Sequence, residues 1–120
     1  MKKLLLAMFS IMMLSACQEV PSLQGKTFVL DTNKNFTISF DTKEDAFYGK
    51  AVNNYFGTYK LDKNNISLNL GGSTMMMGPR EEMEQEQAYF QNLSKVKTYS
   101  LKNKTLELNG DNIIIKFQEQ

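Results

Sequence analysis

Hydrophobic and polar side chains alternate along much of the chain, with a period of two that is typical of β-strands that bury one face. The clearest example is the segment 36–40, in which Phe36, Ile38 and Phe40 are predicted to face the core. Similar runs predict further strands at residues 27–30, 46–52, 55–61, 66–70, 96–101, 105–108 and 113–117. Polar segments separate the runs, and the Asn-Gly pair at 109–110 is typical of a hairpin turn. The glycines at 71–72 are predicted to break the chain before a strand-like stretch at 74–77.

One segment has a helical pattern, and it follows the Gly78-Pro79 pair. Pro79 is predicted to occupy the first helical position, where its missing N–H costs nothing. The residues predicted to form the apolar face are Met83, Ala88, Tyr89, Phe90 and Leu93. The residues predicted to face water are Glu84, Gln85, Glu86 and Gln91. The chain is therefore predicted to be an α+β domain, a curved, mostly antiparallel, open barrel-like sheet of about eight strands with one helix packed across it.

The N-terminus has the pattern of a bacterial lipoprotein signal. Residues 1–3 are a short basic start, residues 4–13 are an apolar run of secretory length, and Leu14-Ser-Ala-Cys17 resembles the lipobox. The predicted division of the chain is a signal peptide at 1–16, lipid attachment at Cys17, a tether at 17–24 and one folded domain at 25–120.

Lipidation would explain why the chain has a single cysteine, and a single cysteine excludes an intrachain disulfide. The acylated Cys17 is expected to attach the protein to the membrane of the bacterial cell envelope. Gln18 follows Cys17, and aspartate at that position is an inner-membrane retention signal in enteric-type bacteria. The outer membrane is therefore the expected location in a Gram-negative cell.

Composition narrows the possible functions. Cleavage before Cys17 removes 16 of the 120 residues and leaves 104, enough for one modest core. Loss of Lys2 and Lys3 lowers the 14 basic side chains to 12, against 13 acidic ones, so no nucleic-acid partner is expected. The chain has no histidine, which excludes Ser-His-Asp and Cys-His catalysis and ordinary histidine-based metal sites. We expect no enzyme activity and no cofactor.

Two segments suggest metal binding, and both have simpler explanations. The methionines at 75–77 offer thioethers, which bind Cu(I). On a strand, however, neighbouring side chains point to opposite faces, so three of them cannot converge on one ion. The acidic residues of the helix lack the tight oxygen-rich turn of a calcium loop and are interpreted as a solvated face; they are Glu81, Glu82, Glu84 and Glu86.

Two further groups suggest ligand or sugar chemistry. Asp41, Glu44 and Asp45 offer paired carboxylates for glycoside hydrolysis, but the chain has no tryptophan to serve as a sugar platform, and a charged turn is the simpler interpretation. Four aromatic residues could form a ligand surface, although their spacing on a sheet favours positions in the core and over the edge of the sheet. This set is Tyr48, Tyr55, Phe56 and Tyr59.

Residues 74–78 with the helix after them, and residues 49–59, carry a resemblance that extends over roughly residues 25–117. On these two segments the chain resembles the META domain (HslJ-like) family. The segment 74–78 with the helix after it is similar to the family's Thr-x-Met-Ala-Cys stretch and Glu-rich helix, and the segment 49–59 is similar to its Gly-Cys-Asn strand pair, with Asn53 at the family's asparagine. Val52 and Gly78 stand where the family has cysteines, and Phe28 stands where tryptophan is common. The resemblance implies a barrel-like α+β fold and no established chemistry, and a redox role for the cysteine pair does not carry over.

The resemblance and the lipoprotein signal together lead to one hypothesis for function. We expect a non-catalytic, lipid-anchored envelope protein that supports envelope integrity or stress tolerance by contacting another envelope protein. The alternative is a small-ligand binder or an inhibitor of an enzyme in the envelope.

Overall fold

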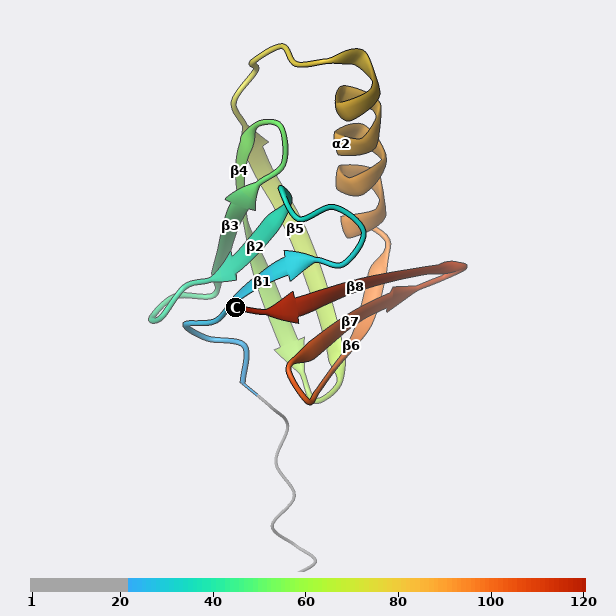
Figure 1. The fold of residues 1–120 in the computed structure, drawn as a ribbon. Coiled ribbons are helices and arrows are strands. Elements are labelled where there is room, and N and C mark those ends of the chain that lie inside the picture. Colours follow the sequence, from blue (N-terminus) through green and yellow to red (C-terminus); the bar gives the residue numbers. More distant parts are fainter. Residues whose placement is uncertain (1–21) are drawn as a thin grey trace, which may run out of the picture.

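The computed structural model describes residues 22–120, which form a barrel of eight antiparallel strands and one helix (Figure 1). The strands are β1 (Thr27–Leu30), β2 (Thr37–Phe40), β3 (Ala46–Lys50), β4 (Asn54–Asp62), β5 (Asn65–Ser73), β6 (Val96–Lys102), β7 (Thr105–Gly110) and β8 (Ile113–Glu119). Each strand pairs with the next along the chain, mostly through short hairpin connections. The connection from β5 to β6 is longer and contains the helix, and these two strands share only the pair Asn65–Thr98. The signal peptide and the lipobox predicted from the sequence lie outside the described residues.

The barrel is closed, whereas the sequence predicted an open one. Closure comes from β8, which pairs with β1 antiparallel, with Leu30 opposite Phe117 and Phe28 opposite Glu119. This pairing closes the sheet but covers only Phe117–Glu119 of β8. Alternation along each strand reveals which face is buried but not which distant strand lies beside it, so the sequence could not show this pairing.

The core contains the inward side chains that alternation predicted. Phe36, Ile38 and Phe40 are all buried, and the ring of Phe40 packs edge-on against Tyr59 and Phe28. Leu23 is also fully buried, although the sequence placed it in the tether. The packed core therefore begins within the segment that we had interpreted as a linker.

The helix α2 (Arg80–Leu93) connects β5 to β6 and lies against the barrel (Figure 1). It begins one residue later than predicted, because Pro79 has an extended ψ of 144° and is the N-cap. Glu81 and Glu82 lie in the first turn, where their charge suits the helix dipole. Within the described residues, no helix is long and apolar enough to cross a membrane.

Two predicted boundaries around β5 and β7 were wrong. The glycines at 71–72 do not end a strand, since β5 continues to Ser73, and residues 74–79 have no regular structure. Residues 109–112 were predicted to link β7 and β8 as a hairpin, and a hairpin is present, but β7 continues to Gly110 and the chain turns at Asp111 and Asn112, where Asn112 has a φ of 61°. Gly110 has another role: a Cβ there would collide with the carbonyl oxygen of Lys95.

Candidate functional site

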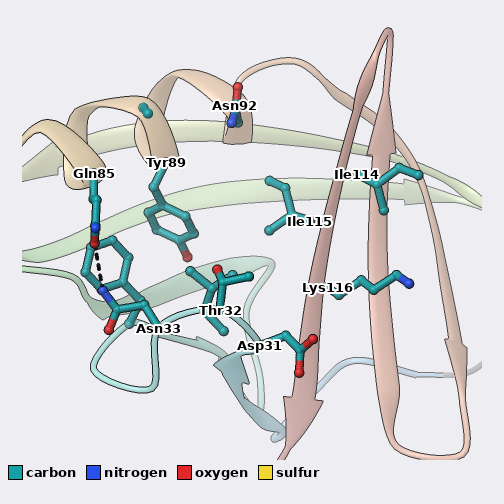
Figure 2. Close-up of a pocket in the computed structure, with 12 residues that line it drawn as sticks. Asp31, Thr32, Asn33, Gln85, Tyr89, Asn92, Ile114, Ile115 and Lys116 are labelled. Carbon is teal, nitrogen blue, oxygen red and sulfur yellow. Dashed lines mark hydrogen bonds between the residues drawn. The ribbon is translucent and has the colours of Figure 1, made fainter.

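A groove of about 560 Å³ lies between α2, the loop that joins β1 to β2, and β8. Figure 2 shows Tyr89 reaching it from the helix, Thr32 and Asn33 from the loop, and Ile115 from β8, and Asn92 lines it at the end of the helix. The other lining residues are Leu30, Asp31, Phe36, Gln85, Ala88, Ile114 and Lys116. The groove therefore has an apolar floor and a polar rim, the composition that is usual for a binding site.

The floor is rigid because Tyr89 is fixed on several sides. Its ring packs edge-on against Phe36, Tyr55 and Phe117, with centroid distances of 5.3, 5.7 and 6.3 Å. Its hydroxyl lies 2.6 Å from that of Tyr55, which in turn donates to the carbonyl oxygen of Thr37 at 2.5 Å. The Tyr89 hydroxyl is therefore the donor in the pair of phenols.

The buried phenols are structural and do not act as bases. Burial raises the pKa of Tyr89 well above its ordinary value, and the charge of Tyr55 would raise it further. Burial also raises the pKa of Tyr55, although the hydrogen bond from Tyr89 opposes this increase. Both phenols therefore stay protonated at neutral pH and serve as hydrogen-bonding groups of the core.

One rim of the groove is held by a hydrogen bond between the loop and the helix. The side-chain amide of Asn33 donates to Oε1 of Gln85 at 3.0 Å, as the dashed line in Figure 2 marks. The loop itself is fixed, because Asn33 Oδ1 accepts from the backbone N–H of Asn35. The rim is therefore ordered before any ligand arrives.

The opposite rim is an incompletely paired part of β8. The ladder between β1 and β8 covers only Phe117–Glu119 of β8, and one further bond joins the N–H of Asp31 to the carbonyl of Lys116. Toward Ile113, β8 pairs with β7 alone. Ile114 lies in this stretch and is 63% exposed.

A second hollow of about 560 Å³ lies on the other side of α2, against the segment 74–79. Its lining includes the methionines at 75–77, Met83 and Phe90, and the polar residues Asn53, Ser73, Thr74, Arg80, Glu84, Glu86, Gln87 and Gln91. The sequence suggested a strand at 74–77, but these residues have no regular structure, and Met75 and Met77 are each 90% exposed.

Asn53 and Glu86 form a buried polar pair beside this second hollow. The backbone N–H of Asn53 donates to Oε2 of Glu86 at 2.6 Å, and its side-chain amide donates to Oε1 at 3.0 Å. Oδ1 of Asn53 accepts from the N–H of Met76 at 2.6 Å and from the hydroxyl of Thr74 at 2.9 Å. This pair therefore joins α2, the start of β4 and the segment 74–79.

The position of Glu86 corrects the predicted helix faces. Glu86 was predicted to face water but is only 5% exposed, whereas Ala88, assigned to the apolar face, is exposed. Tyr89 and Leu93 are buried as predicted, and Phe90 is only half-buried. Glu86 can be buried because the backbone and side-chain N–H groups of Asn53 replace the hydrogen bonds that its carboxyl would make to water.

The other candidates from the sequence have structural roles. Oδ2 of Asp41 accepts from the backbone N–H groups of Lys43 and Glu44 at 3.0 and 2.9 Å, which lowers the pKa of Asp41 and fixes the turn. Tyr55 and Tyr59 are buried in the core, whereas Tyr48 and Phe56 lie opposite each other on the outer face of the sheet. Two of these aromatic residues therefore belong to the core and two to the outer surface, so the four do not form one ligand site.

The sequence did not predict the groove, because its lining comes from three segments that are far apart in the chain, residues 30–36, 85–92 and 114–116. The structure describes no cluster of three or more His, Cys, Asp or Glu side chains within residues 22–120 that could hold a metal ion. Cys17, the predicted lipid attachment site, lies outside the described residues.

Comparisons with known proteins agree with the fold. A family model described as the META domain matches residues 17–120. Among solved structures, the chain is similar to a protein from Burkholderia xenovorans determined by NMR, with a TM-score of 0.70 and 18% identity over 86% of this chain and 93% of that one.

Two further solved structures share the fold. A second protein determined by NMR has a TM-score of 0.62 and 21% identity, with 80% of this chain and 90% of that one covered. A crystal structure of a DUF4847 family protein from Bacteroides vulgatus has a TM-score of 0.54 and 19% identity, with 70% and 58% covered. No curated protein matches the chain.

Proposed function

This chain belongs to the META domain family, and we propose that it is a non-catalytic binding module, lipid-anchored in the bacterial envelope, that holds a segment of another envelope protein in the groove beside α2. Through this contact it supports envelope integrity or stress tolerance. The observation that carries the proposal is the groove itself, with its buried aromatic floor and ordered polar rim.

A protein segment suits this groove because one rim is strand backbone. The β8 edge near Ile114 lacks a neighbour on the β1 side, so an extended segment can add there by main-chain hydrogen bonds. Residues 116 and 118 of β8 face β1, since the N–H of Asp31 bonds to Lys116 and Gln118 pairs with Val29. By alternation, the backbone N–H and C=O of Ile114 point the same way, into the groove.

A small apolar or amphipathic ligand is the second candidate. The observation that favours it is the groove volume of about 560 Å³, which lies within the usual range of small-molecule sites. The two candidates differ in one respect, because a small molecule needs the floor around Tyr89 more than it needs the backbone edge of β8.

The anchor belongs to the same proposal. The lipobox-like sequence that ends at Cys17 supports signal cleavage and acylation there, and Gln18 supports the outer membrane in a Gram-negative cell. A lipid anchor concentrates the domain at the membrane, where its partner would also be found.

The test is co-purification from detergent-solubilised cells. We compare the wild type with a Cys17→Ser form that a non-lipoprotein signal peptide directs to the same compartment, and with an Ile114→Lys variant. Wild type and Cys17→Ser should recover the same specific partner, and Ile114→Lys should lose it. Membrane attachment should be lost only in Cys17→Ser, and attachment that persists in that variant contradicts the anchor.

The matched control is Phe56→Lys, because Phe56 is 58% exposed, close to Ile114, but does not line the groove. Recovery of the partner by Phe56→Lys and its loss in Ile114→Lys support the groove as the docking site. The reverse pattern places the interface on the outer face of β4 and refutes the groove. If no form recovers a protein, the second candidate is tested by screening small ligands against wild type and Ile114→Lys.

A further inference from the structure

We propose that the hollow between α2 and the segment 74–79 binds one Cu(I) ion through methionine thioethers. The ligands are drawn from Met75, Met76, Met77 and Met83, all of which line the hollow. Thioethers are soft ligands, and they select Cu(I) over harder divalent ions. This binding site is separate from the groove on the other side of the helix.

The distribution of methionine along the chain is the first argument. Every methionine after residue 13 lies at this one place, and none occurs in the barrel core. Methionine used as a packing residue fills irregular gaps in a core. Here three of the four side chains are at least 60% exposed instead, so packing does not explain them.

The backbone of the methionine segment is not a strand, since residues 74–79 have no regular structure. The divergence of neighbouring side chains on a strand therefore does not apply to these methionines. Met76 is held at both backbone groups by Asn53, which accepts from its N–H at 2.6 Å and donates to its carbonyl at 3.2 Å. The flanking thioethers of Met75 and Met77 therefore extend from a fixed point and remain free to turn.

The fourth thioether comes from the helix and lies close to this segment. A Cβ at Gly78 would lie 3.6 Å from Sδ of Met83 and 2.8 Å from Cγ1 of Val52. The contact with Val52 is the one that requires a glycine here, whereas the contact with Sδ of Met83 is an ordinary one and places this sulfur next to the end of the methionine segment. Because the segment and the helix are already fixed by the Asn53–Glu86 pair, binding an ion orders only flexible side chains.

The charges around the hollow are compatible with one monovalent cation. Arg80 and Glu84 both line it and carry opposite charges, while both oxygens of Glu86 are occupied by Asn53. No carboxylate pair is therefore available for a hard divalent ion, and the thioethers are the donors that remain unused.

The test is competition for Cu(I) between the full chain in detergent and a chromogenic Cu(I) chelator, under anaerobic reducing conditions. Wild type should withdraw one ion per chain. A Met76→Leu, Met83→Leu double variant, which keeps side-chain volume, should bind at least about tenfold more weakly, since loss of even an outer-shell partner of a metal ligand typically costs that much. Methyl NMR signals of the four methionines should shift with Ag(I), a redox-inert soft ion, in wild type.

The matched control is Glu84→Gln, which removes a carboxylate from the same hollow and leaves every thioether in place. It should lose much less Cu(I) affinity than the double leucine variant, because it removes one charge and no thioether, and both variants should keep the wild-type circular dichroism spectrum. Equal competition by wild type and the double leucine variant refutes the site. So does an absence of competition by wild type, or a loss of binding in Glu84→Gln that the leucine variant does not share.

Discussion

Replacement of Glu86 by glutamine should destabilise the fold even though the two side chains have almost the same shape. The carboxyl accepts two hydrogen bonds, from the backbone N–H of Asn53 at 2.6 Å and from its side-chain amide at 3.0 Å. Glutamine offers one oxygen and one NH₂ group at these positions. Rotation of the amide does not help, since both groups of Asn53 are donors, and one of them must then face another donor.

The size of the effect follows from the burial of the pair. Glu86 and Asn53 are 5% and 2% exposed, so water cannot replace the missing acceptor. An unsatisfied buried donor costs about 1–3 kcal/mol. A loss of about 2 kcal/mol corresponds to a decrease in Tm of about 8–16 °C for a domain of this size.

Urea unfolding of wild type and Glu86→Gln, followed by far-ultraviolet circular dichroism, measures the change in the free energy of unfolding. Glu84→Gln is the control, because Glu84 is exposed on the same helix and should stay within about 0.5 kcal/mol of wild type. In a double-mutant cycle, Asn53→Ala should cost less in the Glu86→Gln background, with a coupling of about 0.5–3 kcal/mol. A Glu86→Gln protein as stable as Glu84→Gln would refute the reasoning.

Three further outcomes are expected. Phe90→Ala should lower the free energy of unfolding by less than about 3 kcal/mol, because Phe90 is half-buried, whereas Tyr89→Ala should lower it by about 3–5 kcal/mol. If urea unfolding gave the reverse order, the face of the helix that packs on the barrel would be wrong. Burial raises the folded-state pKa of Tyr55 and Tyr89 above the unfolded value of about 10, so their contribution is complete below that pH and is lost as pH rises above it. In an ultraviolet absorbance titration these two phenols should therefore ionise only as the protein unfolds, and ionisation in the native state would be evidence against their burial. Gly49→Ala should prevent or severely weaken folding, since its Cβ would collide with a backbone carbonyl. Gly71→Ala should lower the free energy of unfolding by about 1 kcal/mol or less, because its Cβ meets only an exposed aromatic ring and a more distant carbonyl. Equal melting temperatures for the two variants would contradict the register of β3.

Local patterns predicted the strands well, because burial on one face leaves a signal at every second residue. Phe36, Ile38 and Phe40 illustrate this, and all three are in the core. The same reasoning failed at Gly110, whose missing side chain allows a close approach to Lys95 and does not form the turn. A glycine in a sequence does not distinguish these two uses.

The candidate sites depend on contacts between distant residues, so the sequence revealed less about them. Glu86 seemed solvated because it is charged, and its partner Asn53 lies 33 residues away. A signal was nevertheless present, since position 86 is three residues after Met83 and three before Tyr89, on the same side of the helix. Helical period was therefore the better guide to burial, and residue type was the misleading one.

The helix α2 forms a wall of both hollows, and this arrangement determines how the two proposals can be tested. Gln85, Tyr89 and Asn92 line the groove, whereas Met83, Glu86 and Phe90 line the second hollow, where Cu(I) is proposed to bind. If the helix could move as a body, a variant on one side would also alter the other. Two sets of bonds prevent this movement, the phenol pair of Tyr89 and Tyr55 and the bonds of Glu86 to Asn53. Leucine variants of the methionines leave both sets intact, so they should weaken Cu(I) binding at least about tenfold without changing partner recovery. Ile114→Lys should lose the partner and keep Cu(I) binding.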